Sequence, residues 1–242
     1  MNKKINAIVQ ARMGSTRLPG KVLLQIEGIP ILEHIINRLH AVDDISTVII
    51  ATSTEKQDDP IEAWCDIKDV PCVRGSEDNV LDRFRQAALD YPADIYIRAT
   101  GDNPMIDVQL IRNMLGFFEN NYLTYTCYKG YPIGSGVEIF TKKALEESIK
   151  QATLPYELEH VTPYMYNKMQ DRRVKYYTSP DELSNIRMTV DTEEDLTFAK
   201  TVFSKLYSEN PLFGIDAITE LLSSDKKLLT INSMVHQKKL GE

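Results

Sequence analysis

The sequence predicts a three-layer α/β/α fold built on a mostly parallel, Rossmann-like sheet. In its first half, short β-branched runs alternate with segments whose apolar residues recur at helical spacing. The alternation has the interval of strand–helix–strand units, which form parallel sheets. The composition, 43% hydrophobic and 26% charged over 242 residues, is that of a globular protein that buries a substantial core. Ligands of such sheets bind at the carboxyl ends of the strands.

Each element of the first half has its own signal. Residues 5–10 form an apolar, strand-like run, and in residues 30–42 the apolar side chains recur at helical spacing. On the same grounds, the predicted strands are residues 5–10, 47–51, 72–74 and 94–99. The predicted helices are residues 30–42, 59–68, 79–91 and 107–120.

The strand–helix rhythm breaks after about residue 121. Beyond it, the predicted strands are residues 122–128, 137–141, 174–178 and 187–190. The predicted helices are residues 142–151, 155–169 and 193–207. No internal repeat marks a second unit. We therefore expect residues 1–242 to form a single domain, with an irregular subregion inserted or appended at about 122–180.

Charge, hydropathy and cysteine usage exclude several classes of protein. The net charge of −7 argues against a general nucleic-acid binder, which needs a basic stripe. No apolar run is long enough for a signal peptide or a membrane span, so a cytoplasmic protein without membrane contacts is expected. The three cysteines form no CxxC pair, which predicts reduced thiols and neither a zinc site nor a disulfide framework.

A basic loop over residues 11–21 follows the first strand. Its cations are Arg12, Arg17 and Lys21, which lie among two glycines, a serine and a threonine. Glycines let the backbone turn its N–H groups toward an anion, and arginine binds phosphate bidentately. The loop is not a P-loop, because its glycines are separated by five residues instead of four and residues 22–24 look like a strand. The alternative is a solvated surface loop without function.

Two aspartates follow strand ends and suit a divalent cation. Asp102 comes in a Gly-Asp-Asn-Pro sequence after the fourth strand, and Asp191 follows the run at residues 187–190. Mg²⁺ takes one or two carboxylates and otherwise binds waters and substrate phosphates. Each aspartate also has a structural interpretation, because Asp102 could close a turn and Asp191 could cap the helix that follows.

Residues 10–21 resemble the N-terminal motif of the sugar-acid cytidylyltransferases, in particular the SpsF-like branch of spore coat polysaccharide biosynthesis. The CMP-Kdo and CMP-sialic-acid synthetases are similar in outline. Further matches are the GDxP segment at Asp102 and the VDTxxD segment from Asp191 to Asp195, so the resemblance spans most of the chain. It implies a nucleotidyltransferase fold, CTP as substrate, Mg²⁺ held near Asp102 and Asp191, and a surface position on its helix for Asp195.

The resemblance also assigns the two ends of the pocket. It places Gly75 and Ser76 beside the nucleobase, with Thr52 contributing to the same pocket, although Ser76 could equally be an ordinary helix cap. The residues expected to contact the acceptor are Arg98, Tyr131, Glu138 and His160. A lone histidine is more often structural than catalytic. Gly136 and Leu158 depart from the family pattern, in which an acidic and a basic residue are common, so the identity of the acceptor stays open.

The predicted function is cytidylyl transfer from CTP to a sugar acid or similar hydroxyl- or phosphate-bearing substrate, with release of pyrophosphate, for surface polysaccharide biosynthesis. Catalytic roles are predicted for Arg12, Lys21 and Asp102. The predicted nucleotide-binding residues are Ala11, Arg12, Gly14, Ser15, Arg17, Lys21, Thr52, Gly75, Ser76 and Asp102. The alternatives are a nucleotide-sugar-dependent glycosyltransferase, whose usual D-x-D pair is missing at the strand ends, and a catalytically silent nucleotide-binding protein. Related synthetases are often dimers, which implies a homodimer through residues 122–180.

Overall fold

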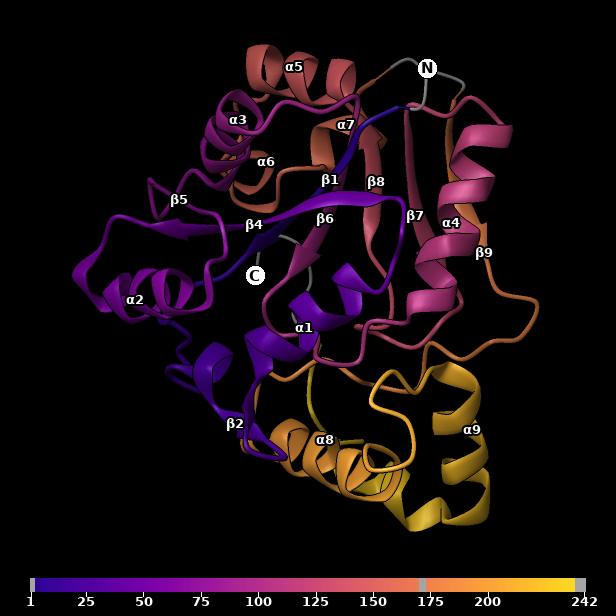
Figure 1. The fold of residues 1–242 in the computed structure, drawn as a ribbon. Coiled ribbons are helices and arrows are strands. Elements are labelled where there is room, and N and C mark those ends of the chain that lie inside the picture. The colour runs from indigo at the N-terminus through magenta and orange to yellow at the C-terminus, as the bar shows by residue number, and fades with distance from the viewer. Residues whose placement is uncertain (1–2, 170–172, 238–242) are drawn as a thin grey trace.

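A seven-stranded sheet lies at the centre of the computed structural model, which describes residues 3–169 and 173–237 (Figure 1). The strand order is β5-β4-β1-β6-β8-β7-β9. The strands are β1 (Ile5–Gln10), β4 (Ile45–Ser53), β5 (Cys72–Gly75), β6 (Ile95–Thr100), β7 (Tyr125–Lys129), β8 (Glu138–Thr141) and β9 (Val174–Thr178). Among these described strands, β8 alone runs against its neighbours, and the other pairs are parallel. The predicted, mostly parallel sheet is confirmed.

Helices cover both faces of this sheet (Figure 1). One face carries α1 (Ile31–His40), α2 (Asp59–Lys68), α4 (Val108–Asn120), α8 (Glu193–Leu206) and α9 (Ile215–Ser224). The other carries α3 (Val80–Asp90), α5 (Lys142–Gln151), α6 (Pro155–His160) and α7 (Pro163–Asn167). Successive residues of β1 enter different cores, because Ala7 and Val9 pack on the first face and Ile8 on the second. The predicted three layers are therefore present.

Two segments adopt a secondary structure that differs from the predicted one. The strand-like run after the basic loop is a short 3-10 helix, η1 (Lys21–Leu23), which follows Gly20 in the left-handed conformation at φ 70°. The helix predicted at residues 155–169 is broken into α6 and α7. Val161 interrupts it with φ 70°, and Pro163 begins the next helix because it has no N–H to continue the previous one.

The strand predicted at residues 187–190 does not form in the described part of the sheet. Its Met188 and Val190 are buried, as the apolar alternation requires, but the segment makes only one isolated bridge, between Arg187 and Ile133. The same alternation fits an extended segment that packs on a core without a full strand partner. The elements that were not predicted are β2 (Gln25–Ile26), β3 (Ile29–Pro30), η2 (Lys56–Asp58), α9 and η3 (Lys226–Thr230).

The subregion predicted at residues 122–180 contributes to the central sheet. It supplies β7, β8 and β9, and its helices α5 and α6 pack against α3. Strand β9 pairs with β7 and forms one edge of the sheet. The break in the sequence rhythm therefore marks a change from parallel to mixed strand pairing.

Gly101 brings the carboxyl ends of β1 and β6 together. Its N–H donates to the carbonyl of Gln10 over 2.8 Å. A Cβ at this position would lie 3.0 Å from the Cβ of Ala11, so the close approach favours glycine. The basic loop and the turn that carries Asp102 consequently begin at the same edge of the sheet.

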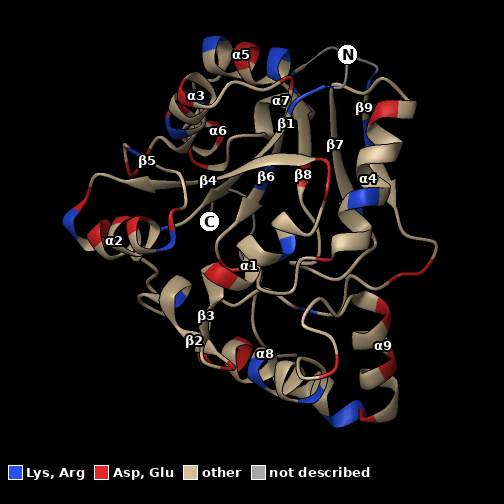
Figure 2. Cartoon of the chain, viewed as in Figure 1, with Lys and Arg blue, Asp and Glu red and all other residues tan. Residues whose placement is uncertain are grey.

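Charged residues are spread over the outer helices. Figure 2 shows both basic and acidic residues on α2, α5 and α8. Of the helices in residues 3–169 and 173–237, none has the length and apolar character needed to cross a bilayer.

Candidate active site

A cleft of about 920 Å³ lies at the carboxyl edge of the sheet, which is large enough for a nucleotide and a second substrate. The predicted site residues that line it are Ala11, Arg12, Gly14, Ser15, Arg17, Lys21, Arg98, Asp102, His160 and Asp191. The predicted site residues outside this lining are Thr52, Gly75, Ser76, Tyr131 and Glu138. The structure therefore brings the phosphate and metal candidates together and separates them from several base and acceptor candidates.

The basic loop is held in shape by backbone hydrogen bonds and one buried carboxylate. The Met13 carbonyl accepts from the N–H groups of Ser15 and Gly20, over 2.8 and 2.9 Å. The Met13 N–H donates to Asp58 Oδ1 over 2.7 Å, and Asp58 is fully buried, where it also accepts from Ser53. The sequence pattern did not point to Asp58, because an aspartate just before a helix looks like an ordinary cap. Asp58 anchors the start of the loop beside the cleft.

Lys21 lies between the two predicted metal ligands. Its Nζ is 2.8 Å from Asp102 Oδ2 and 2.6 Å from Asp191 Oδ1, and the residue is only 8% exposed. Burial lowers the pKa of Lys21, but the two carboxylates more than offset this and leave the pKa raised. Burial raises the pKa of Asp191, yet Lys21, Arg17 and Arg187 bring it below its ordinary value. Lys21 and Asp191 are therefore both charged at neutral pH.

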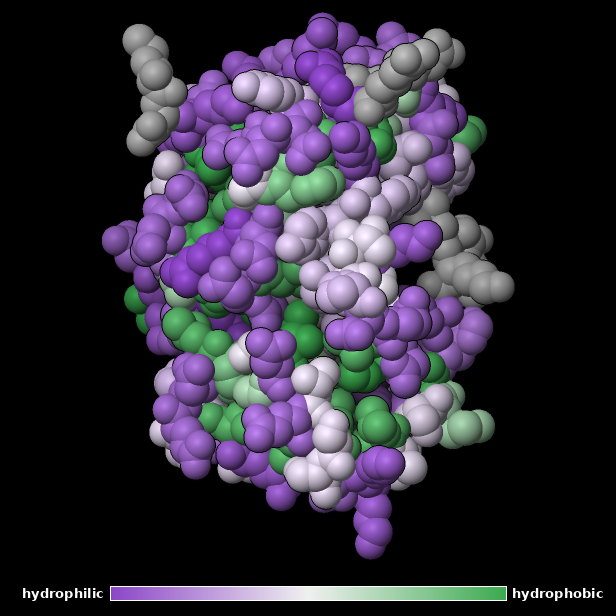
Figure 3. Space-filling view, turned by 90° about the vertical axis from the view of Figure 1, so that its right-hand side faces the viewer, coloured by the Kyte–Doolittle hydropathy of each residue, from purple (hydrophilic) through white to green (hydrophobic). Residues whose placement is uncertain are grey.

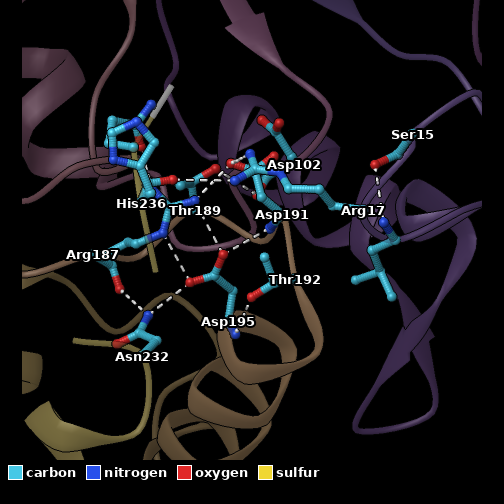
Figure 4. A network of polar contacts seen from close by, with 12 residues as sticks. Ser15, Arg17, Asp102, Arg187, Thr189, Asp191, Thr192, Asp195, Asn232 and His236 are labelled. Carbon is cyan, nitrogen blue, oxygen red and sulfur yellow. Dashed lines mark hydrogen bonds and ion pairs between the residues drawn. The ribbon is translucent and has the colours of Figure 1, made fainter. Parts of the chain in front are cut away.

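Asp191 is not the helix cap that its sequence context allowed. The residue that caps α8 is Thr192, whose Oγ1 accepts from the N–H of Asp195 over 3.3 Å. Asp191 points instead toward Lys21 and Asp102 (Figure 4). The Val190 N–H donates to the Asp102 carbonyl over 2.8 Å, which ties the two aspartate segments together.

The two arginines of the loop also line the cleft. Arg17 Nη2 is 3.0 Å from Asp191 Oδ2, and its Nη1 donates to the carbonyl of His236 over 3.2 Å. Arg12 is more open, with 44% of its side chain exposed, and lies 3.8 Å from Glu77 and 3.9 Å from Glu159. Arg12, Arg17 and Lys21 are three cations that line the same cleft and form a site for a polyanion.

Asp195 does not lie on the helix surface, so that expectation was wrong. It is 1% exposed and accepts from Arg187 Nε over 2.9 Å, from Asn232 Nδ2 over 2.9 Å and from the Asp191 N–H over 3.0 Å. Asp195 faces inward from the first turn of α8, where it supplies the counter-charge that Arg187, itself 7% exposed, needs.

Of the acceptor candidates, Arg98 lines the cleft, and Glu138 holds Arg98 in place. Arg98 lines the cleft and donates from Nε to Gln10 Oε1 over 2.8 Å, while its Nη1 binds Glu138. Glu138 also accepts from the hydroxyls of Tyr125 and Thr162. The carboxylate of Glu138 is thus used to orient Arg98 rather than to reach the cleft.

His160 lines the cleft, whereas Tyr131 stacks on another ring. The pKa of His160 is lowered, mainly by burial, so its imidazole is neutral at pH 7. The rings of Tyr131 and Tyr177 lie nearly parallel, at 12°, with centroids 6.0 Å apart. Tyr131 packs with the hydrophobic core and is not part of the cleft lining.

The departures at Gly136 and Leu158 have structural explanations. A Cβ on Gly136 would lie 2.4 Å from the Tyr128 ring, so no side chain fits there. Tyr128 itself lines the cleft, and it occupies the space in which an acidic side chain at position 136 would lie. Leu158 packs against the second core. The acceptor end of the cleft therefore differs in shape from the one that the family pattern implies.

Arg83 is the cleft residue that sequence analysis missed at the base end. It is 2% exposed and lines the cleft, its Nη1 donates to the Ser76 carbonyl over 2.7 Å, and its Nε has no partner among the described residues. Gly75 admits it, because a Cβ there would lie 3.0 Å from the Arg83 Cγ. Helical spacing puts position 83 beside inward-facing Val80, which was the available signal.

The other two base candidates, Thr52 and Ser76, lie outside the cleft lining. Thr52 is fully buried, and its Oγ1 has no hydrogen-bond partner within the described residues. The Oγ of Ser76 accepts from the N–H of Asn79 over 3.1 Å, and Asn79 caps α3. Ser76 therefore supports the turn that leads into the helix.

Asp102 and Asp191 have the chemistry for a shared divalent cation. Both carboxylates approach one cationic nitrogen, and no described group binds Asp102 Oδ1. Hard carboxylate oxygens suit Mg²⁺, which completes its coordination with phosphate oxygens and water. The described residues contain no group of three or more His, Cys, Asp or Glu that could hold a metal ion by themselves. The donor set fits a metal that arrives with a phosphate ligand.

A family model for cytidylyltransferases matches residues 6–231, which include the whole basic loop and both aspartates. The chain belongs to the cytidylyltransferase family. This confirms the resemblance seen in the basic loop and makes the protein a nucleotidyltransferase rather than a glycosyltransferase.

Individual cytidylyltransferase relatives agree with the family match. The spore coat polysaccharide biosynthesis protein SpsF of Bacillus subtilis is 33% identical over 230 residues, which cover 92% of this chain and 95% of that protein. A 3-deoxy-manno-octulosonate cytidylyltransferase of Geobacter metallireducens is 34% identical over 108 residues, 45% of this chain and 42% of that one. A solved cytidylyltransferase structure from Leptospira borgpetersenii superposes with a TM-score of 0.88 at 31% identity, covering 97% of this chain and 100% of its own.

Proposed function

We propose that this protein transfers CMP from CTP to a hydroxyl or phosphate group of a sugar acid or similar small substrate, releasing pyrophosphate, for surface polysaccharide biosynthesis. One observation carries the proposal. Lys21 is held between Asp102 and Asp191 at the carboxyl edge of the sheet, with Arg12 and Arg17 at the same cleft. This arrangement offers both positive charge for a triphosphate and carboxylates for its metal.

The chain's residues would act mainly by positioning and by neutralising charge. An acceptor oxygen attacks the α-phosphorus of CTP and forms a new P–O bond, while the bond from that phosphorus to the β-phosphate oxygen breaks. Pyrophosphate leaves with the electron pair of the broken bond, and a hydroxyl acceptor loses its proton to water. Arg12, Arg17 and Lys21 hold the negative charge of the departing pyrophosphate. Arg17 and Lys21 exchange part of their carboxylate contacts for phosphate contacts when CTP binds.

Mg²⁺ is the proposed cofactor, with Asp102 and Asp191 as its protein ligands. When bound, it polarises the α-phosphate and lowers the pKa of an acceptor hydroxyl. Support comes from the free Oδ1 of Asp102 and from the convergence of both carboxylates on the Lys21 ammonium. Lys21 holds the two aspartates near each other, although their charges repel.

Arg83 supports a preference for cytosine. Arginine carries only donors, and Arg83 is one of the residues that line the cleft. Cytosine presents adjacent acceptors at O2 and N3, whereas uracil carries an N–H at position 3. An N–H of Arg83 that faces this edge of the base would therefore match cytosine and would meet the N3–H of uracil in an unfavourable donor–donor contact.

Arg98 supports a sugar acid as acceptor. It is fixed in the cleft lining by Gln10 and Glu138, and a preorganised guanidinium binds a carboxylate well. The name of the Geobacter relative specifies such an acid, 3-deoxy-manno-octulosonate, and that of the Bacillus relative specifies polysaccharide biosynthesis.

Pyrophosphate release tests the proposal. The protein is incubated with Mg²⁺, one of CTP, UTP, ATP or GTP, and one of a panel of sugar acids, neutral sugars and sugar phosphates. We expect pyrophosphate only with CTP and an acid or phosphate acceptor, together with a higher melting temperature in CTP than in UTP. A rise in melting temperature without pyrophosphate under any pairing would favour a silent nucleotide-binding protein.

A further inference from the structure

A polar network of Arg187, Asp195 and Asn232 lies next to Asp191 (Figure 4), and these three residues are outside the cleft lining. Arg187 donates to both oxygens of Asp195, from Nε over 2.9 Å and from Nη2 over 3.1 Å. The same Nη2 donates to Asp191 Oδ2 over 2.7 Å. Arg187 and Asp195 are 7% and 1% exposed, and neither is a predicted site residue.

The network leaves the two oxygens of Asp191 with different surroundings. Oδ2 is bound by Arg187 and, over 3.0 Å, by Arg17. Oδ1 faces Lys21 and, through it, Asp102. The Asp191 backbone is held as well, because its N–H donates to Asp195 Oδ2 over 3.0 Å. The contacts from Arg187 and Asp195 therefore fix both the rotation and the position of the Asp191 carboxylate.

Asn232 holds the network from a distant part of the chain. Its Nδ2 donates to Asp195 Oδ1 over 2.9 Å and to the Arg187 carbonyl over 3.1 Å. Asp195 thus accepts hydrogen bonds from a guanidinium, a side-chain amide and a backbone N–H. A residue that only capped its own helix would need fewer partners. A fully hydrogen-bonded buried carboxylate of this kind has one orientation.

We infer that Arg187 and Asp195 are positioning residues that hold Asp191 so that its Oδ1 faces the cleft as a metal ligand. The inference rests on the proposed function, since it assigns a support to the proposed metal site. Asp195 keeps Arg187 from turning its whole guanidinium onto Asp191. Without the Asp195 carboxylate, Asp191 is the carboxylate that remains to neutralise the buried guanidinium of Arg187. Arg187 then binds both of its oxygens and withdraws Oδ1 from the metal.

Mn²⁺ binding to Asp195→Asn tests this inference without turnover. Free Mn²⁺ is measured by electron paramagnetic resonance as the metal is titrated into protein with CTP and no acceptor. We expect binding about 10- to 100-fold weaker than in the wild type, as for other residues that orient metal ligands. Binding of CTP in EDTA should change by less than about twofold, because Asp195 lies outside the cleft lining.

Asp107→Asn is the matched control. Asp107 is also a buried aspartate, 6% exposed, but it accepts from the N–H groups of Leu110 and Ile215 and lies outside the cleft lining. Its variant should melt at a lower temperature and bind Mn²⁺ as the wild type does. If Asp195→Asn does not fold, Arg187→Lys takes its place, because lysine cannot bind both carboxylates in the same geometry.

The outcomes separate this inference from the proposed function. Wild-type Mn²⁺ affinity in folded Asp195→Asn or Arg187→Lys would overturn the positioning role and leave the proposed function standing. A wild-type protein that binds neither CTP nor Mn²⁺ with CTP would instead contradict the proposed function itself. Weaker Mn²⁺ binding with unchanged metal-free CTP binding supports the inference.

Discussion

Lys21 is the residue at which the charges of the basic loop and the two aspartate segments meet. Lys21→Met should lower the rate of pyrophosphate release from CTP by about 100-fold or more, because a buried cation at the leaving group is lost. Lys68→Met is the control. Lys68 also pairs with a carboxylate, Glu33, over 2.9 Å, but its side chain is 43% exposed and lies outside the cleft. A Lys21→Met rate within threefold of wild type would exclude a phosphate role for this lysine.

His160 should make the stability of the protein depend on pH. Its pKa is lowered in the folded state, chiefly by burial, so below pH 6.5 the unfolded chain binds more protons than the folded one. Stability therefore falls as the pH drops from 6.5 through the lowered pKa. Between about pH 7.5 and about pH 5.5, the melting temperature of wild type should fall more than that of His160→Gln. His40→Gln, at the end of α1, should follow the wild type, and identical slopes for all three proteins would contradict this prediction.

Sequence alone was sufficient to bring into one cleft the residues whose charge and position are both local. Arg12, Arg17 and Lys21 stand together in one loop, and Asp102 and Asp191 were recognised beside their motifs. Arg83, Arg187 and Asp195 could not be assigned, because their neighbours come from other parts of the chain. A buried arginine or aspartate looks like a surface residue until its partner is known. Glu138 illustrates the same limit, since its charge is used by Arg98 instead of a substrate.

At the scale of elements, Gly134 controls how the loop before β8 meets the Asp191 segment. It has φ 87°, and a Cβ there would lie 2.7 Å from the Thr189 nitrogen. Gly134→Ala should therefore lower the free energy of unfolding by about 1–3 kcal/mol. Gly116→Ala is a matched control within α4, where a Cβ would meet nothing within 4 Å. It should stabilise the protein by about 0.5–1 kcal/mol, and urea unfolding measures both. Equal stability of the two variants would contradict the close approach.

The elements that sequence predicted best are those with a strong period. The buried strands β1, β4 and β6 and the amphipathic helices α1, α3 and α4 were located within a few residues. The predictions of secondary structure failed where the backbone conformation, and not the side-chain pattern, determines the element. Val161 with a positive φ divides one helix, and residues 187–190 stay extended because they meet a loop instead of a strand.

At the scale of the whole molecule, we propose the edge of the sheet at β9 as the contact surface of the expected homodimer. Tyr176 on this strand is 48% exposed, and an edge strand offers unpaired backbone groups. On the face turned to the viewer in Figure 3, hydrophobic residues lie in separate groups among hydrophilic ones, so strand pairing would contribute much of the contact. Tyr176→Lys should shift the protein from dimer to monomer in sedimentation velocity. Ile67→Lys, at an 81% exposed site on α2, should not. Equal oligomeric states in the two variants would exclude this edge.

The most direct test of metal-assisted cytidylyl transfer in this cleft is the rate of pyrophosphate release by Asp102→Asn with CTP, Mg²⁺ and an accepted sugar acid. Asparagine keeps the shape of Asp102 and removes the charge that would hold the metal. The rate should fall by about 100-fold or more, with the melting temperature near that of the wild type. A wild-type rate in the folded variant would contradict the assignment of Asp102 and, with it, the proposed chemistry of the cleft.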